Sequence, residues 1–498
     1  MKGSTYLIVV LGILVAKGLG FGRNIIFASA FGASELTDIY FQIFGIAANV
    51  FTGIGTSLAT LVIKNLNKAE NQGEIAQKRY VSHFICKIGT MALVAAAAMY
   101  VLADPIVRLL LPGLDEVFYA DARRMMYIML PSTLFVMVAY IMSGVLQNSK
   151  VFFITSIMSL PYNVIIIGSL LLKNIDIYTT CWITTLGWFL HIVILLPDFY
   201  RKGFRFFYRS PEQGGTILKE RNLEMLYIFI SSMMFQMCFV FDKAAVSHDS
   251  GAATTMNYAS NFFITIASIF VVAMSNVSFP SISKYYEKRN TSAVRKTTQQ
   301  LICLLFAVIV PFILVALIFG NDIMSLLYER GKFTSELTRE TAVLFVIYTF
   351  GIFGYVCQEL FNKILYLGSQ YRYPVVGSIV IMVLKPIINV FVVDYGVEAV
   401  AISTTALFTV YAGLIAVSMT KVTGNYLTGE LGKNLLKILA AGLAALAVYG
   451  IYCFTGVELL GGKLAFLVPL MICGVVYIAA IAMSGIARVL LPKQIAEE

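Results

Sequence analysis

The stretch "AKGLGFGRNIIF", residues 16–27, places two full cations, Lys17 and Arg23, inside the first apolar segment of the chain. That segment covers about residues 5–30, and a helix needs roughly 20 residues to cross a bilayer. Backbone groups inside lipid must bond within their own segment, so the run predicts a membrane helix. An ionisable residue there costs at least roughly 2.5–3.5 kcal/mol, and it therefore predicts a cavity or a charged partner.

Apolar runs of this kind recur along the whole chain. The chain has 498 residues, of which 59% are hydrophobic and 13% are charged, whereas a soluble protein carries roughly 25% charged residues. The composition and the runs predict an all-α polytopic membrane protein with fourteen transmembrane helices. The predicted helices cover about residues 5–30, 39–63, 80–102, 124–147, 151–172, 177–199, 223–246, 254–282, 297–320, 341–367, 371–393, 397–420, 434–455 and 463–487.

The net charge of +10 follows the predicted topology. With the N-terminus inside, the cytoplasmic segments contain 23 Lys and Arg residues and the outer loops contain eight. The positive-inside rule therefore predicts that both termini are cytoplasmic. The basic excess reports this topology and not a nucleic-acid partner. The seven cysteines and three histidines show no disulfide framework and no metal-ligand spacing.

An internal repeat divides the chain. Residues 200–222 form the longest predicted cytoplasmic linker, with six predicted helices before it and eight after it. Seven residues between positions 32 and 71 recur 219 positions later, among them a Gly-Ala pair. The pattern predicts two parallel six-helix bundles, residues 1–199 and 223–420, with the substrate site between them. Residues 421–498 would add helices thirteen and fourteen.

Three glycines lie between the two cations of the first helix. In a regular helix Lys17 and Arg23 are about 9 Å apart along the axis and about 240° apart around it. Gly18, Gly20 and Gly22 alternate with apolar residues, and glycine admits unusual backbone. Bending or unwinding there would bring both cations to one cavity that accepts anions. In the alternative, the cations extend to the membrane surface or pair with acidic residues at the start of the second helix.

Other ionisable residues lie within later helices. Asp242 and Lys243 lie toward the outer end of the seventh helix, where they could extend to the surface. Lys385 lies deeper, beside the helix-breaking Pro386. The sequence contains no Walker A, HExxH or GxSxG motif. It therefore predicts a transporter and not an enzyme.

Several stretches resemble one transporter family. These are "GLGFGRNIIFASAFGASELTDIYF" (18–41), "MLPSTLFVMVAYIMSGVLQNSKVF" (129–152), "FPSISKYY" (279–286) and "ERGKFT" (329–334). They are similar, in this order, to the MurJ/MviN lipid II flippases within the wider superfamily of multidrug exporters and polysaccharide flippases. The resemblance covers roughly residues 10–420.

The resemblance implies a V-shaped pair of bundles in the bacterial cytoplasmic membrane. A monomer of this kind would export a polyprenyl-diphosphate-linked glycan, foremost the peptidoglycan precursor lipid II, by alternating access. A basic cavity would hold the headgroup, and a groove beside the two additional helices would hold the lipid tail. The alternatives are a flippase for an O-antigen or capsule unit and a cation-coupled multidrug exporter. The exporter would need acids in the first bundle, where this sequence has cations.

The resemblance also implies a headgroup site. Lys17 and Arg23 fall on the family's two basic positions in the first helix, and Asp38 falls on its acidic position. Asn24 stands in place of an acid, and Asn261 in place of an arginine. Lys385 is a candidate replacement cation. Lys and Arg match phosphate oxygens, arginine with two parallel hydrogen bonds.

Some relatives place a cation site in the second bundle. Asp242, Asn389 and Thr405 could supply its oxygen ligands here, although Val393 stands where a second carboxylate would help. The expected energy source is a monovalent cation or the membrane potential, which favours outward movement of an anion. No organic cofactor is expected.

Overall fold

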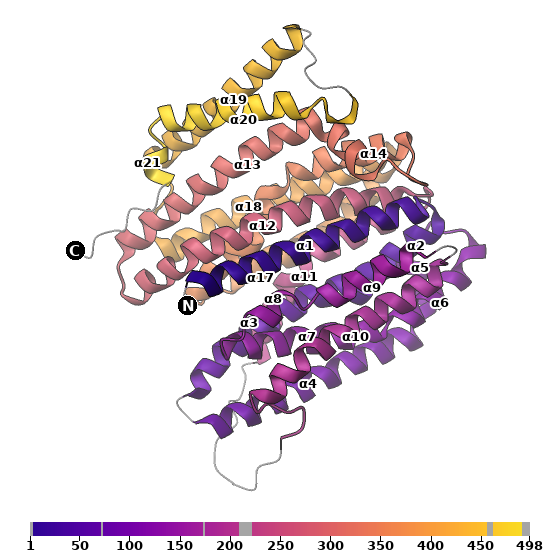
Figure 1. The fold of residues 1–498 in the computed structure, drawn as a ribbon. Helices are drawn as coiled ribbons and strands as arrows, with labels where there is room; N and C mark the ends of the chain where they lie inside the picture. The colour runs from indigo at the N-terminus through magenta and orange to yellow at the C-terminus, as the bar shows by residue number, and fades with distance from the viewer. Residues whose placement is uncertain (1–2, 71–72, 173–174, 209–221, 456–461, 491–498) are drawn as a thin grey trace. The chain divides into compact units, whose positions relative to one another are not determined.

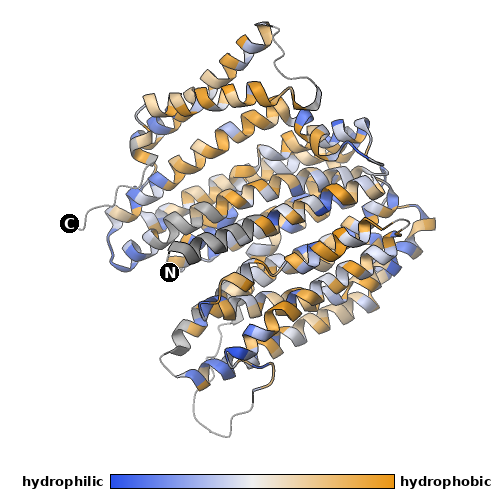
Figure 2. Cartoon of the chain, in the orientation of Figure 1, coloured by the Kyte–Doolittle hydropathy of each residue, from blue (hydrophilic) through white to orange (hydrophobic). Residues whose placement is uncertain are grey.

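A computed structural model describes residues 3–70, 73–172, 175–208, 222–455 and 462–490. These residues form helices and loops without a strand. Among them, nine helices are long and apolar enough to cross a membrane, and ten if Ser335–Thr349 and Ile352–Leu367, bent by 56°, form one broken span. Figure 2 shows hydrophobic residues along most of the length of the long helices. The all-α, multi-pass membrane class is thus confirmed.

The helices before residue 250 are labelled in Figure 1. Two short helical turns, η1 and η2, accompany eleven α-helices. They are α1 (Gly3–Phe31), α2 (Glu35–Phe44), η1 (Gly45–Val50), α3 (Phe51–Glu70), α4 (Glu74–Val101), α5 (Ala103–Leu110), η2 (Glu116–Phe118), α6 (Tyr119–Met129), α7 (Pro131–Asn148), α8 (Phe153–Ser156), α9 (Leu160–Leu170), α10 (Ile177–Arg201) and α11 (Asn222–Ala245).

The helices after residue 250 include α12 and α13, which are the two longest helices in the described part of the chain. They are α12 (Ala252–Glu287), α13 (Thr291–Tyr328), α14 (Ser335–Thr349), α15 (Ile352–Val356), η3 (Cys357–Phe361), α16 (Asn362–Leu367), α17 (Arg372–Val392), η4 (Val393–Tyr395), α18 (Val397–Thr423), α19 (Gly429–Thr455), η5 (Gly462–Leu464), α20 (Leu467–Met483) and α21 (Ala487–Leu490).

Two predicted spans contain a local irregularity, although each remains one continuous candidate for a membrane span. The segment predicted over 124–147 crosses the junction of α6 and α7, where Pro131 occupies the start of α7. Proline suits that position because the first N–H groups of a helix have no partner within it. The span predicted over 39–63 contains the π-helical turn η1 between α2 and α3. Such turns interrupt the regular hydrogen-bond ladder and often lie at functional sites.

The chain divides into two compact units. The first comprises residues 1–257, 330–333 and 378–400, and the second comprises residues 258–329, 334–377 and 401–498. The predicted division into bundles 1–199 and 223–420, with additional helices in 421–498, stays a prediction. Of the predicted linker 200–222, residues 209–221 lie outside the described residues, as do 456–461 and 491–498 of the last segment.

Helix α7 forms the centre of the first unit, where it packs against α3, α4 and α10. Small residues bring these helices close together. A Cβ atom on Gly144 would lie 2.9 Å from the Ala59 backbone, and one on Gly55 would lie 2.9 Å from the Tyr140 side chain. Close approach through small residues is the usual way in which membrane helices associate. On another side of the unit, α1 packs against α8 and α9 (Figure 1).

In the second unit α13 packs against α14 and α19, and α19 packs against α20. Ala441 and Ala445 of α19 and Tyr477 of α20 form a small buried cluster. The Tyr477 hydroxyl donates a hydrogen bond of 2.9 Å to the carbonyl of Ala307 in α13. This bond fixes α20 against α13 by a polar contact as well as by packing.

Candidate functional site

The two first-helix cations lie on one unbroken helix. Helix α1 continues through Gly18, Gly20 and Gly22 without interruption. Lys17 is exposed and Arg23 is half-buried. Because a regular helix separates the two residues by about 240°, the structure does not bring them to one face. Unwinding of the glycine segment, which would bring them together, stays a prediction.

Arg23 has defined partners within the first unit. Its guanidinium lies over the ring of Tyr162 in α9, 4.9 Å from the centroid. Its Nη2 and Nε donate to Oδ1 of Asn24, at 2.9 and 3.3 Å. Arg23 and Asn24 are neighbours in the sequence, so this contact does not test their role in headgroup binding, which stays a prediction. A cation held over an aromatic face keeps its other N–H groups for an anion.

Helices α9 and α10 build the surface on which Arg23 rests. The Tyr162 ring packs against Trp188, at 5.1 Å between centroids, and against His191, at 5.6 Å. Gly187 makes this possible, since a Cβ atom there would lie 2.3 Å from the Tyr162 ring. The position of Arg23 is therefore set by three buried rings. The sequence indicated none of them.

Asp38, which the family resemblance places in the headgroup site, lies in a buried network of hydrogen bonds. It is 4% exposed. Its Oδ2 accepts the N–H of Gly251 at 2.7 Å, and its Oδ1 accepts the N–H of Thr254 at 2.7 Å and the Thr254 hydroxyl at 2.5 Å. The carboxylate of α2 thereby caps the N-terminus of α12. Binding of a headgroup by Asp38 would have to displace these hydrogen bonds.

Two further polar residues hold α2 in place. Lys243 is 4% exposed, and its Nζ donates to the carbonyl of Phe41 at 2.9 Å. It is buried and does not extend to the membrane surface as predicted. The Gln42 amide donates to the carbonyls of Leu110, at 2.8 Å, and of Val240, at 3.0 Å. The sequence could have indicated this contact, because Gln42 is a lone amide in an apolar segment and such a group needs a hydrogen-bond partner.

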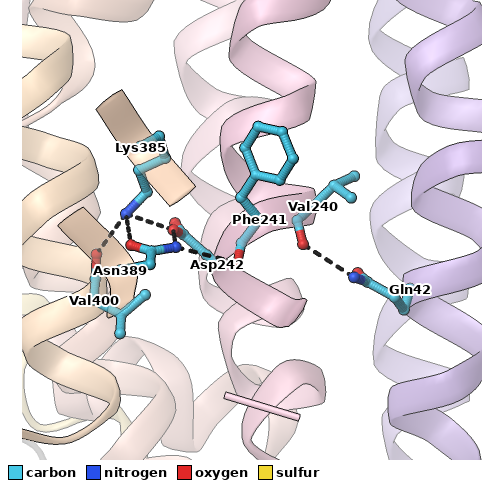
Figure 3. Close-up of polar contacts among 7 residues, drawn as sticks. All are labelled: Gln42, Val240, Phe241, Asp242, Lys385, Asn389 and Val400. Atoms are coloured by element: carbon cyan, nitrogen blue, oxygen red, sulfur yellow. Dashed lines mark hydrogen bonds and ion pairs between the residues drawn. The ribbon is translucent and has the colours of Figure 1, made fainter. Parts of the chain in front are cut away.

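Asp242, Lys385 and Asn389 form one buried cluster (Figure 3). The Lys385 Nζ lies 2.6 Å from Oδ1 of Asp242 and 2.6 Å from Oδ1 of Asn389. It also donates to the carbonyl of Val400 at 3.1 Å. Lys385 and Asp242 are both 0% exposed. Lys385 was predicted in the headgroup site and Asp242 in a cation site, and the structure pairs the two residues.

The remaining predicted residues belong to the second unit. Asn261 is half-buried in α12. The hydroxyl of Thr405, in α18, donates to the carbonyl of Ile347 at 3.0 Å. Their roles in a headgroup site and in a cation site stay predictions.

Comparison with known proteins identifies the family. Residues 27–489 match the sequence profile of the family described as "Lipid II flippase MurJ". The chain belongs to the MurJ lipid II flippase family. It is therefore a transporter and not an enzyme, and a multi-pass protein of the inner membrane.

Individual relatives agree with this family. The chain is 24% identical over 395 residues to a probable lipid II flippase MurJ of Buchnera aphidicola subsp. Baizongia pistaciae, covering 76% of each chain. It is 22% identical over 394 residues to the lipid II flippase MurJ of Burkholderia cenocepacia, covering 76% of this chain and 75% of the relative.

Solved structures show the same fold. A lipid II flippase MurJ in an inward closed conformation matches with a TM-score of 0.75 and 19% identity, covering 97% of this chain and all of that one. An inward-facing multidrug transporter of the MATE family matches with a TM-score of 0.59 and 10% identity, covering 84% of this chain and 99% of that one.

Proposed function

We propose that this chain moves lipid II from the inner to the outer leaflet by alternating access. Family membership supports the substrate. The observation that carries the proposal is the half-buried guanidinium of Arg23, held over the ring of Tyr162 on a mostly apolar helix. Because a diphosphate cannot enter hydrocarbon without a partner for its charges, a cation fixed at this place on α1 is what its transport requires.

In this proposal α1 contributes most of the headgroup contacts. Lys17 and Arg23 bind the diphosphate, and Asn24 orients the guanidinium through its side-chain oxygen. Asn261 contributes a neutral amide from the second bundle. Asp38 acts indirectly, by holding α2 against the start of α12. Lys385 would reach the headgroup only by leaving Asp242.

We further propose fourteen transmembrane helices with both termini in the cytoplasm. Two six-helix bundles, residues 1–199 and 223–420, would form a V around the headgroup cavity, and the linker 200–222 would join them. The chain would act as a monomer. A groove beside the helices in residues 421–498 would take the lipid tail. Apolar side chains on α19 and α20 support this role, since Leu443 is 65%, Met471 71% and Met483 87% exposed.

The membrane potential is the proposed energy source. A cytoplasm-negative potential favours outward movement of an anion by about 2.3 kcal/mol per charge per 100 mV. A diphosphate carries about two charges, so this term can bias transport without a bound ion. The sequence also suggests a monovalent cation as a second source, but Lys385 already occupies the oxygens of Asp242 and Asn389 that would bind it.

Complementation tests the proposal. A bacterium depleted of its own lipid II flippase would receive the chain, and growth and externalised lipid II would be measured. We expect rescue by the natural chain and by Lys433→Ala, a control that removes an exposed lysine of α19. Arg23→Ala and Lys17→Ala should each lower externalisation by roughly 10- to 100-fold, since a hydrogen bond to a charged group contributes about 1.5–3 kcal/mol.

The same assay separates the alternatives. Full rescue by both alanine variants, at equal levels in the membrane, would refute the role of the two cations. Failure of the natural chain to externalise lipid II, together with export of an O-antigen or capsule intermediate, would assign the other lipid-linked glycan.

A further inference from the structure

The buried cluster around Lys385 has the form of an occupied cation site. At least three oxygens surround the ammonium, namely a carboxylate oxygen of Asp242, the amide oxygen of Asn389 and the carbonyl oxygen of Val400, at 2.6, 2.6 and 3.1 Å. They come from three helices, α11, α17 and α18. Carboxylate, amide and carbonyl oxygens are also the ligands that hard metal cations prefer.

A second layer of hydrogen bonds orients these oxygens. The Nδ2 of Asn389 donates to the carbonyl of Phe241 at 3.1 Å and to Oδ1 of Asp242 at 3.2 Å (Figure 3). These bonds turn the amide oxygen of Asn389 toward the ammonium. Lys385 and Asn389 are four residues apart, so both side chains lie on one face of α17.

A metal ion does not fit this cluster while Lys385 is present. Its nitrogen occupies the point toward which the oxygens converge. The negative charge of Asp242 is balanced by Lys385, and an additional cation would leave a net positive charge at a place with 0% exposure. An uncompensated buried charge carries a large desolvation penalty. The residues therefore disfavour a bound metal both sterically and electrostatically.

We propose that the ammonium of Lys385 is a tethered substitute for a metal cation in the site formed by Asp242, Asn389 and Val400. The site is permanently filled, and this chain needs no free Na⁺, Li⁺ or K⁺ there. Removing the amine would open an oxygen-lined site for a small monovalent cation. This inference concerns the ion-pair cluster alone and is independent of which lipid-linked glycan the chain carries.

The first experiment uses the natural chain. Full-length protein purified in detergent would be heated in NaCl, LiCl, KCl and choline chloride at equal ionic strength. We expect the same Tm in all four salts. A rise in Tm specific to Na⁺ or Li⁺ that is lost in Asp242→Asn would overturn the proposal, because it would show that a metal ion binds despite the lysine.

The second experiment compares Lys385→Ala, which removes the amine and leaves space, with Lys385→Met, which removes the amine and fills the space. We expect both variants to have a lower Tm than the natural chain in choline chloride. Only Lys385→Ala should recover in NaCl, with a saturable rise of roughly 2–4 °C. Adding Asp242→Asn to Lys385→Ala should abolish this recovery.

The variants can also contradict the proposal. If the Tm of Lys385→Ala is lowered equally in NaCl and in choline chloride, no metal ion replaces the ammonium. Failure of this variant to yield folded protein in either salt would lead to the same conclusion. An equal rise in Tm of the alanine and methionine variants in NaCl would show that the salt acts at a place other than the space left by the amine.

Discussion

Asp38 and Thr254 are 216 residues apart in the chain, and one carboxylate oxygen of Asp38 accepts both the N–H and the hydroxyl of Thr254, at 2.7 and 2.5 Å. The second oxygen accepts the N–H of Gly251, whose φ of 85° lies in the left-handed region. A carboxylate at a helix N-terminus satisfies its unpaired N–H groups and interacts favourably with the helix dipole. The start of α12 is therefore completed by a residue of α2.

The cap at α12 should contribute measurably to stability. Thr254→Val removes one hydroxyl donor and should lower the free energy of unfolding by about 1 kcal/mol. Asp38→Ala leaves buried N–H groups without an acceptor and should cost about 2–3 kcal/mol. Chemical unfolding in detergent would measure both. Equal losses in the two variants would contradict the capping role, because the valine variant keeps both backbone bonds.

The Asp242–Lys385 pair should show strong coupling. Asp242→Asn or Lys385→Met alone leaves one buried charge unpaired and should cost about 3–5 kcal/mol. The double variant Asp242→Asn/Lys385→Met removes both charges at similar volume and should lie much closer to the natural chain. A double-mutant cycle measured by unfolding in detergent gives the coupling energy. Additive losses would show that the two residues act separately.

The glycines of α1 should affect transport more than folding. A Cβ atom on Gly18 or Gly22 would meet nothing within 4 Å, so alanine at either position should stabilise the helix by about 0.5–1 kcal/mol. If transport requires the segment to unwind, both variants should flip lipid II more slowly while having a higher Tm. Unchanged transport in both variants would refute the proposal that this segment of α1 unwinds.

Gly32→Ala is a control in which alanine should destabilise the protein, in contrast to alanine at Gly18 or Gly22. Gly32 has a φ of 68°, and its Cβ would lie 2.9 Å from the carbonyl oxygen of Lys332. Alanine there should lower the free energy of unfolding by about 1–2 kcal/mol through backbone strain, and the close contact with the Lys332 carbonyl should add to this loss. Chemical unfolding in detergent would measure it.

The Tyr162 ring should position Arg23. Tyr162→Leu removes the aromatic face and about 0.5–2 kcal/mol of cation–π interaction, so the guanidinium should lose its fixed position and externalised lipid II should fall. Tyr162→Phe keeps the ring and should retain transport. Loss of transport in both variants, at equal membrane levels, would instead point to the tyrosine hydroxyl.

The helices were predictable where apolar runs are long and uninterrupted. The run 177–199 corresponds to α10, which covers Ile177–Arg201, because lipid leaves helix as the only solution for such a segment. The apolar pattern did not indicate the π-helical turn at Gly45–Val50, which contacts the distant helices α7 and α11 as well as its neighbours in the chain. The family was also predictable, because short sequence motifs identify it without any knowledge of the fold.

The environments of the charged residues were less predictable than their positions. Depth in the membrane marked Arg23 and Lys385 as residues that need partners. The family resemblance marked Asp38, and Asp242 was expected to extend to the surface or to bind a cation. The partners come from distant segments, such as Tyr162 for Arg23 and Thr254 for Asp38. Spacing along one helix carries no information about such contacts, so the sequence assigned Lys385 to the headgroup and Asp242 to a metal ion.

The Asp242–Lys385 pair also imposes an order on biosynthesis. Asp242 leaves the ribosome 143 residues before Lys385, which corresponds to roughly 7–30 s at the usual rates of translation. In the proposed topology, α11 enters the bilayer during that interval, before Lys385, the partner of its aspartate, has been synthesised. The proposed topology therefore implies that contacts with the insertion machinery or the earlier helices hold α11 until α17 arrives and completes the pair.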